Sequence, residues 1–223
     1  MSWVAMTMYK MHSSRCPRKN HREFYDGKSL VDIKIEQFLN CGAEHVYVST
    51  NDPDVEDTDR VTYIQRPEHL CDDSYEGVMA NPWPVVMKHI YHSLPVSDDT
   101  VIIYSNVVVP LFHRYDEMYE RYLETGNNQL VVHPVKHHCL NHDKLGVNFM
   151  AGHYHARSQE LHPVYQVPWG GTLATLKDIK AVDGYPIPRD FEYFPVSMTE
   201  HIDIDTEEEY ELCQAIYKQK ISK

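Results

Sequence analysis

The amino-acid sequence predicts an α/β fold built on a mostly parallel sheet. Short apolar runs alternate with amphipathic segments through residues 1–135, which is the pattern of strands joined by crossover helices. The run from Val101 to Tyr104 is apolar throughout, as in a central strand buried on both faces. A chain of 223 residues is long enough for a large core, so we expect one domain over residues 1–223.

The expected elements follow one another along the chain. Besides 101–104, apolar runs predict strands at 3–9, 46–49, 61–64, 130–134 and 201–204. Helical spacing predicts helices over 29–41, from about 81, over 115–124 and over 206–220. Ser29 and Asp32 suit the start of the first helix and Gly42 its end, while a proline at 82 is accepted in a first turn.

The segment 136–195 breaks this alternation. It is rich in His, Tyr, Pro and Gly, and we interpret it as a small β-rich excursion from the sheet. Aromatic residues such as Tyr154, Tyr165 and Trp169 are of the types enriched at interfaces. The excursion is therefore a candidate interaction surface.

Charge and cysteine usage limit the partners. A net charge of −12 and a pI near 5.6 argue against nucleic acid binding by broad phosphate neutralisation. Five scattered cysteines without a CxxC pair indicate reduced thiols. The chain has no long apolar stretch and does not begin like a secretory signal. We expect a cytoplasmic protein without nucleic acid or membrane partners.

A basic loop follows the first predicted strand. It offers Lys10, Arg15, Arg18 and Lys19 together with the hydroxyls of Ser13 and Ser14. Cations that neutralise phosphate oxygens, with hydroxyls that supply directional bonds, suit a polyphosphate. The glycines and the GK[ST] ending of a P-loop are absent. From composition alone, a solvated loop without a ligand is the alternative.

Other polar groups also follow predicted strands. They are the turn at 49–52, Arg66, and the pair at 105–106. Because ligands of parallel sheets bind beyond the carboxyl ends of the strands, we expect these groups and the basic loop to meet at one edge.

Four segments in order resemble the CMP-sugar-acid cytidylyltransferases, which include CMP-sialic acid and CMP-Kdo synthetases. They are Lys10-x-x-Ser13-x-Arg15-x-Pro17-x-Lys19-Asn20, Ser49-Thr50-Asn51-Asp52, Ile64-Gln65-Arg66-Pro67-Glu68-His69-Leu70 and Asp203-Ile204-Asp205-Thr206. The resemblance implies a Rossmann-like, GT-A-like nucleotidyltransferase fold, a three-layer sandwich with a mixed sheet. It implies an enzyme that transfers CMP from CTP to a sugar acid of the sialic acid type and releases pyrophosphate. It further implies a homodimer formed through the 136–195 excursion.

The resemblance also assigns roles to residues. The nucleotide-binding set is Lys10, Ser13, Ser14, Arg15, Lys19, Asn20, Arg66 and Asn106, of which Lys10, Arg15 and Lys19, with Asp205, would be catalytic. Asp203 and Asp205 would bind Mg²⁺, since this hard cation takes one or two carboxylates and phosphate oxygens. From the residues alone, Asp205 or Thr206 can equally cap the last helix, with Glu209 completing a capping box.

Two departures leave alternatives open. Lys10 stands where the family usually has arginine, which loses a bidentate contact. The family's Q-P-T-S-P-L appears as Asn106-Val107-Val108-Val109-Pro110-Leu111, which predicts an altered pocket beside the nucleotide. The first alternative is therefore a cytidylyltransferase whose acceptor is a phosphonate or another small acid. The second is a non-catalytic nucleotide-binding homologue.

Fifteen histidines raise a third alternative, a metal-dependent hydrolase. The candidates are His133, His137, His138, His142, His153, His155 and His162, but none forms an HExxH pattern. We favour a polar His/Tyr surface that lines an acceptor pocket or an interface.

Overall fold

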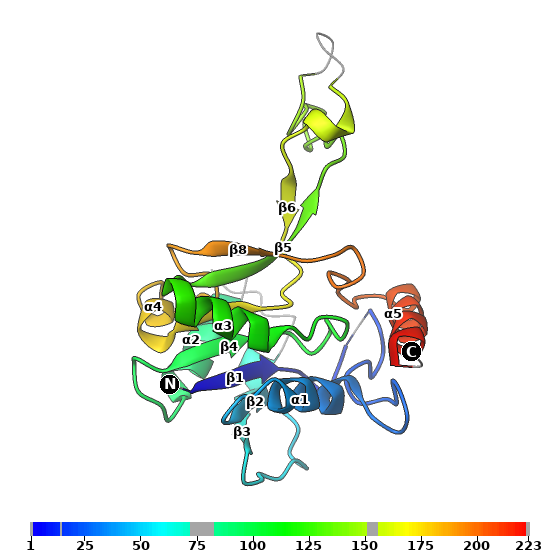
Figure 1. The fold of residues 1–223 in the computed structure, drawn as a ribbon. Coiled ribbons are helices and arrows are strands. Elements are labelled where there is room, and N and C mark those ends of the chain that lie inside the picture. The colour runs from blue at the N-terminus through cyan, green and yellow to red at the C-terminus, as the bar shows by residue number, and fades with distance from the viewer. Residues whose placement is uncertain (1, 14, 72–82, 151–155, 222–223) are drawn as a thin grey trace.

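The computed structural model describes residues 2–13, 15–71, 83–150 and 156–221. In these residues an eight-stranded sheet has the order β3-β2-β1-β4-β7-β5-β6, with β8 paired to β5 (Figure 1). The strands are β1 Trp3–Met8, β2 Val46–Thr50, β3 Val61–Gln65, β4 Val101–Tyr104, β5 Gln129–Val135, β6 Val164–Gln166, β7 Thr172–Thr175 and β8 Glu192–Pro195. The pairs β1–β2, β2–β3, β1–β4 and β5–β8 are parallel, whereas β7 is antiparallel to both of its neighbours. The predicted α/β class with a mostly parallel mixed sheet is confirmed.

Helices cover both faces of the sheet and make a three-layer sandwich. The helices are α1 Leu30–Asn40, α2 Trp83–Ser93, α3 Tyr115–Thr125, α4 Leu176–Lys180 and α5 Glu207–Ile221, with 3₁₀ turns at η1 Glu68–Leu70 and η2 Ser158–Glu160. Figure 1 shows α1 and α3 on the near face, and α2 and α4 behind the sheet. None of the helices in the described parts of the chain is long and apolar enough to cross a membrane.

The alternation of side chains along β1 explains the two faces. Trp3 and Ala5 pack in the cluster that contains Phe38 of α1 and Tyr115 of α3. The intervening residues face the other cluster, which contains Met87 of α2. Because strand residues alternate between faces, a strand covered on both sides must be apolar throughout, and all six residues of β1 are buried.

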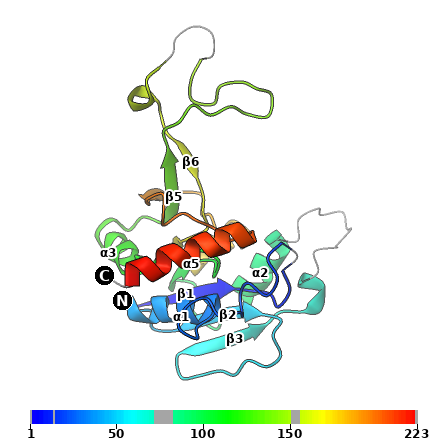
Figure 2. The ribbon, with the colours of Figure 1, turned by 90° about the vertical axis from the view of Figure 1, so that its right-hand side faces the viewer.

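A third cluster attaches α5 to the start of α1. Tyr210 and Cys213 of α5 pack with Phe24, Leu30 and Ile33. Figure 2 shows α5 in front of the sheet, above α1. This packing brings the C-terminal part of the chain beside the loop that follows β1.

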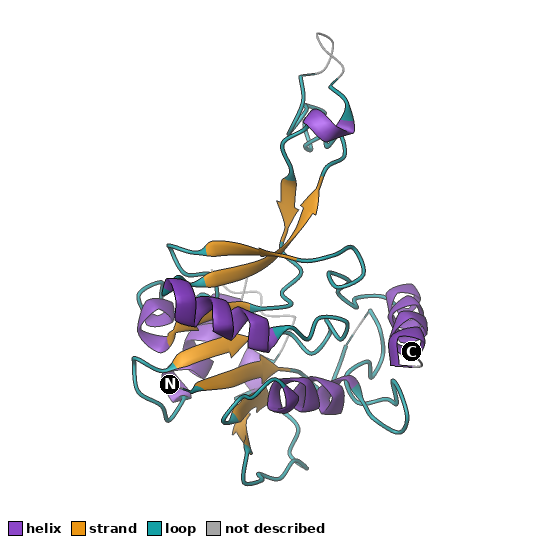
Figure 3. Ribbon diagram, in the orientation of Figure 1, coloured by secondary structure: helices purple, strands orange, loops and turns teal. Residues whose placement is uncertain are grey.

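The predicted excursion over 136–195 is too long. The outer half of β5 leaves the main sheet and pairs with β6, and together they carry a projecting arm, defined by residues 133–166 (Figure 3). Residues after the arm return to the sheet, where β7 lies between β4 and β5 and β8 pairs with β5. Each of these returning strands has polar residues or a proline among its four positions (TLAT and EYFP), so neither is apolar throughout as β4 is.

The strand predicted at 201–204 is wrong. Ile204 donates its N–H to the Val108 carbonyl at 2.9 Å, but the segment forms no ladder with another strand. Ile204 is fully buried and Ile202 packs against the same cluster under α5. The apolar alternation therefore reflects anchoring to the core.

Capping residues set the helix starts as predicted. Ser29 and Asp32 form the reciprocal capping box of α1, and Gly42 after its end has a positive φ of 90°. At α5, the Glu209 side chain accepts from the N–H groups of Asp205 and Thr206, and Thr206 Oγ1 accepts from the Glu209 N–H. The predicted helix start near Asn81 and Pro82 lies outside the described residues.

Candidate functional site

The carboxyl ends of the central strands meet at one edge of the sheet, as predicted. Just beyond β1, the Tyr9 N–H donates to the Ser49 carbonyl at 3.0 Å, and the Met11 N–H donates to Asn51 Oδ1 at 3.0 Å. After β4, the Ser105 N–H donates to the Met6 carbonyl at 3.1 Å. The turn at 49–52 thus supports the first residues of the basic loop.

Two buried polar side chains hold the base of the basic loop. Arg66 Nη2 donates to the Tyr9 carbonyl at 2.5 Å, and Asn20 Nδ2 donates to the Lys10 carbonyl at 3.1 Å. Both residues are buried. Both acceptor carbonyls lie at the entry of the loop and Asn20 lies at its exit, so Arg66 holds the entry and Asn20 ties the exit to it.

Asp52 forms a second support beneath the loop. Its Oδ2 accepts from the Tyr9 hydroxyl at 3.3 Å and lies 3.9 Å from His21 Nδ1. The rings of Tyr9 and His21 meet edge to face at 4.9 Å. Burial lowers the pKa of His21, against the pull of Asp52, so the neutral imidazole is favoured here.

The basic loop and the C-terminal acidic segment meet at Asp205. Its Oδ1 accepts from Arg15 Nη2 at 2.8 Å and lies 3.3 Å from Lys19 Nζ, which also donates to the Ile204 carbonyl. The Lys19 side chain is 11% exposed, whereas that of Arg15 is 66% exposed. Lys19 therefore holds the acidic segment in place, and Arg15 extends toward solvent.

The remaining loop residues that the resemblance assigned to nucleotide binding are Ser13, Lys10 and Ser14. Ser13 Oγ accepts from the Cys16 N–H at 3.4 Å and so stabilises the turn. Lys10 contributes its carbonyl to Asn20. Ser14 lies outside the described residues.

Asp203 lies beside this ion cluster and its Oδ1 is buried without a hydrogen-bond partner among the described residues. Burial and the neighbouring Asp205 raise the pKa of Asp203 to about 7, although Lys19 opposes the shift. A carboxylate that is hard to ionise and lacks a donor is suited to receive a cation.

The two carboxylates offer oxygen donors of the kind that Mg²⁺ prefers. The described residues contain no group of three or more His, Cys, Asp or Glu that would hold a metal ion alone. Mg²⁺ bound to nucleotides takes one or two carboxylates and completes its shell with phosphate oxygens and water. The unpartnered oxygen of Asp203 and the exposed side of Asp205 supply this donor set.

Asn106 lies at the end of β4, on the same edge. Its Oδ1 accepts from the hydroxyl of Tyr104, and its N–H donates to the Trp169 carbonyl at 3.0 Å. Tyr104 and Tyr9 also belong to this site. Each is the last residue of an apolar run, so the sequence pattern assigned it only to the core. A hydroxyl at the end of a predicted strand could have indicated its place at this edge of the sheet.

The valines after Asn106 are core residues. Val107 and Val109 are buried in the cluster under α1 and α3, and Val108 packs against it while its carbonyl accepts from Ile204. Of the three valines only Val108 is partly exposed, and the altered pocket beside the nucleotide stays a prediction.

In the parts of the chain that the structure describes, the histidines do not form a group of three or more side chains that could hold a metal ion. His133 stacks on His201 with ring centroids 4.2 Å apart, and its Nδ1 lies 3.1 Å from the Val196 carbonyl. His138 Nε2 lies 2.9 Å from the Ala156 carbonyl. His153 and His155 are outside the described residues.

Comparison with known proteins places the fold. No family model matches the sequence, and no curated protein matches it. A solved CMP:2-keto-3-deoxy-manno-octonic acid synthetase in complex with CTP is similar over 99% of this chain and 100% of its own, with a TM-score of 0.64 and 14% identity. A 4-diphosphocytidyl-2C-methyl-D-erythritol synthase from Anaerococcus prevotii is similar over 97% and 99%, with a TM-score of 0.65 and 10% identity.

A third structure, 2-C-methyl-D-erythritol 4-phosphate cytidylyltransferase from Francisella tularensis, is similar over 96% of this chain and 99% of its own, with a TM-score of 0.62 and 11% identity. At these identities the likeness establishes the fold. The chain shares its three-layer α/β fold with these three solved structures, as the resemblance implied.

The titration of Asp203 predicts how stability depends on pH. Because its folded-state pKa is raised, the folded chain binds this proton more tightly than the unfolded chain, and stability falls as pH rises from about 4 to about 7. In metal-free buffer, Asp203→Asn should therefore be more stable than wild type by about 1–3 kcal/mol at pH 8. Chemical denaturation across this range measures the difference. The exposed Asp99→Asn serves as a control, and parallel curves for wild type and Asp203→Asn would contradict the prediction.

Proposed function

We propose that the protein is a cytidylyltransferase that transfers CMP from CTP to a small acidic acceptor and releases pyrophosphate. The observation that carries the proposal is the meeting of Arg15, Lys19 and Asp205 beyond the carboxyl end of β1. One solved protein of the same fold is named a cytidylyltransferase, and another, named a CMP:2-keto-3-deoxy-manno-octonic acid synthetase, is in complex with CTP.

The chemistry needs charge neutralisation more than covalent work. An acceptor hydroxyl oxygen attacks the α-phosphorus of CTP, loses its proton, and forms the new P–O bond. The bond from the α-phosphorus to the bridging oxygen breaks, and pyrophosphate leaves with that oxygen. Positioning and electrostatic stabilisation supply most of the rate in such transfers.

The residues divide this work between them. Lys10, Ser13, Ser14, Arg15 and Lys19 would bind the triphosphate, since ammonium, guanidinium and hydroxyl groups match phosphate oxygens. Asn20, Arg66 and Asn106 would keep the loop and the strand ends in place around the nucleotide. Asp203 and Asp205 would hold Mg²⁺, which when bound neutralises charge on the phosphates.

The acceptor we favour is a sugar acid of the sialic acid or nonulosonate type. A phosphonate acceptor is the alternative, because the valine run at 107–109 replaces the polar centre that the resemblance would place beside the nucleotide. Incubation with CTP, Mg²⁺ and a panel of sugar acids and phosphonates, followed by measurement of pyrophosphate, tests both acceptors. CTP binding without pyrophosphate release from any acceptor would favour a non-catalytic nucleotide-binding protein.

Arg15 should contribute directly to CTP affinity. Its guanidinium is two-thirds exposed, so Arg15→Ala should fold normally and lose a charge-assisted contact worth roughly 1.5–3 kcal/mol of binding free energy. Titration calorimetry with CTP measures the loss. Arg157→Ala, which removes an exposed arginine from the arm, is the matched control. Equal CTP affinity of the Arg15 and Arg157 variants would contradict a phosphate-binding loop.

Substitutions at Asp205 and Thr206 should distinguish a role in metal binding from a role in capping helix α5. Thr206→Ala breaks the capping box and should cost roughly 1 kcal/mol of stability while activity is largely kept. Asp205→Asn spares the box and should lower turnover by about two orders of magnitude or more, because a neutral amide is a poor Mg²⁺ ligand. Thermal melts and rates at saturating Mg²⁺ give both readouts. Near wild-type turnover in Asp205→Asn would make the acidic pair structural.

We also propose that the protein is a homodimer assembled through the arm. Leu140, Leu145, Val147 and Met150 are exposed on the arm by more than half, and Tyr165 lies at its base against Tyr193 with ring centroids 4.2 Å apart. Burial of such apolar surface favours association. Sedimentation should give twice the mass of the 26.1 kDa chain. A monomer mass at every concentration would refute it.

A further inference from the structure

Lys34 is a lysine buried on the apolar face of α1. It lies one turn after Leu30 and one turn before Phe38, and its residue exposure is 0%. Its Nζ donates to the carbonyls of Val109 at 2.9 Å and Phe112 at 3.4 Å, and to the Tyr115 hydroxyl at 2.6 Å. All three partners are uncharged, and burial lowers the pKa of Lys34 to about 7.

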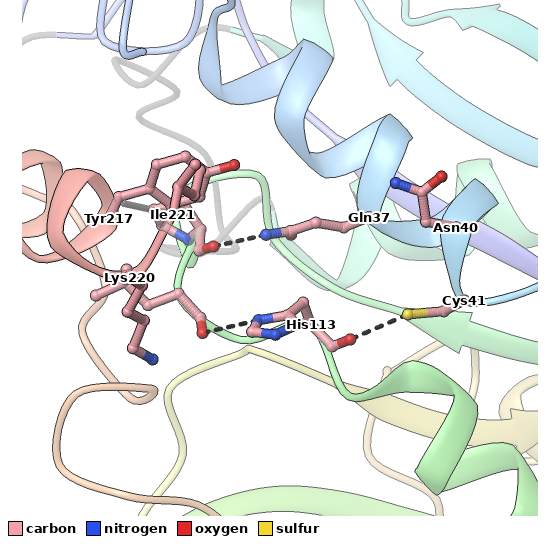
Figure 4. Close-up of a pocket in the computed structure, with 9 residues that line it drawn as sticks. Gln37, Asn40, Cys41, His113, Tyr217, Lys220 and Ile221 are labelled. Atoms are coloured by element: carbon pink, nitrogen blue, oxygen red, sulfur yellow. Dashed lines mark hydrogen bonds between the residues drawn. The ribbon is translucent and has the colours of Figure 1, made fainter. Parts of the chain in front are cut away.

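These contacts belong to a larger attachment between α1 and one irregular segment. Gln37 Nε2 donates to the Pro110 carbonyl at 2.7 Å, and Cys41 Sγ donates to the His113 carbonyl at 3.0 Å. Figure 4 shows these two contacts at the edge of a cavity of about 280 Å³ between α1 and α5. Positions 34, 37 and 41 share one face of the helix. That face therefore satisfies four carbonyls of a segment that has neither helix nor strand to do so.

The attached segment reaches the nucleotide site at two points. At one end, Tyr115 donates its hydroxyl hydrogen to Ser105 Oγ at 2.9 Å, and Ser105 precedes Asn106. Nearer the middle, the Val108 carbonyl accepts from the N–H of Ile204, the residue between the two proposed metal ligands. The position of the Lys34 amine thus bears on both Asn106 and the acidic segment.

We propose that Lys34 is a positioning residue for the nucleotide site, acting by holding segment 105–115 against α1. The kinetic consequence rests on the proposed cytidylyltransferase function, whereas the structural consequence does not. An apolar side chain of the same length would fill the volume but would remove the donor of the Val109 carbonyl, and the Phe112 carbonyl would keep only the Tyr115 hydroxyl at 3.3 Å. Buried carbonyls left unpaired destabilise the conformation that buries them, so the segment would shift.

The charged and titratable groups around Lys34 are few. Tyr115 on α3 and Cys41 on α1 face it, and burial raises the pKa of both, so they are uncharged near neutral pH. The amine therefore loses its proton at a lower pH when the chain is folded than when it is unfolded. The unfolded chain then binds more protons, and stability should rise with pH from about 7 to about 10.

The test compares Lys34→Met with Lys28→Met, which makes the same change at an exposed lysine paired with Glu36. In Lys34→Met, hydrogen exchange at the Ile204 amide should be at least about tenfold faster, while Ile103 in the sheet stays protected. The kcat should fall by about tenfold to a hundredfold, as expected for displaced reacting groups. The rise in stability between pH 7 and about 10 should disappear. Lys28→Met should match wild type in all three.

Each result has a distinct meaning. Wild-type exchange at Ile204 in a folded Lys34→Met would overturn the positioning role, even if the protein proved not to bind CTP. A failure of wild type to bind CTP, with faster exchange in Lys34→Met, would refute the proposed function alone. If Lys34→Met does not fold, Tyr115→Phe keeps the ring and removes the link to Ser105. Faster exchange at the Asn106 amide in that variant would support the proposal, and unchanged exchange would overturn it.

Discussion

The contact on which the site depends is the one that Asp205 makes with Arg15 and Lys19. It joins a loop near the start of the chain to a segment near its end. Asp205 lies 190 residues after Arg15 and 186 residues after Lys19 in the sequence. Two cations so close together repel each other, and the shared carboxylate offsets that repulsion. Although the chain has a net charge of −12, this ion pairing holds a positively charged loop beside the ends of β1 and β4.

Buried polar groups beneath the loop convert this contact into a defined geometry. Arg66 holds the entry of the loop, and Asn20 ties the exit to it. Asp52 supports Tyr9 and His21, and Lys34 holds segment 105–115 against α1. Each side chain is paired with a backbone carbonyl or an uncharged group, so each contact fixes a direction. Such preorganised surroundings allow a few exposed charges to act on a ligand with little reorganisation.

The sequence predicted the parts that depend on local pattern. The apolar run at β4 and the Ser29 capping box gave the correct elements, and the topology of parallel strands brought the basic loop and Asn106 to one edge. It failed where tertiary contacts decide. β7 is short and sits between distant strands, and Ile202 and Ile204 alternate because they anchor to α5. The sequence shows Lys34 as a cation on the apolar face of a helix. Its carbonyl partners could not be predicted, because they lie 75 and 78 residues away in the chain.

The contacts of Asp203 and Asp205 help to distinguish an enzyme from a protein that only binds a nucleotide. The Thr206 and Glu209 box caps α5, so neither Asp203 nor Asp205 is needed there. Asp205 has a structural partner in the basic loop, whereas the buried oxygen of Asp203 has no donor among the described residues. A buried carboxylate oxygen without a hydrogen-bond donor destabilises the folded chain, and such a cost is usually tolerated where function needs it. A protein that only sensed a nucleotide through its cations would gain stability from an apolar or amide side chain at that position. The acid at position 203 therefore supports the proposed enzyme over a protein that only senses a nucleotide.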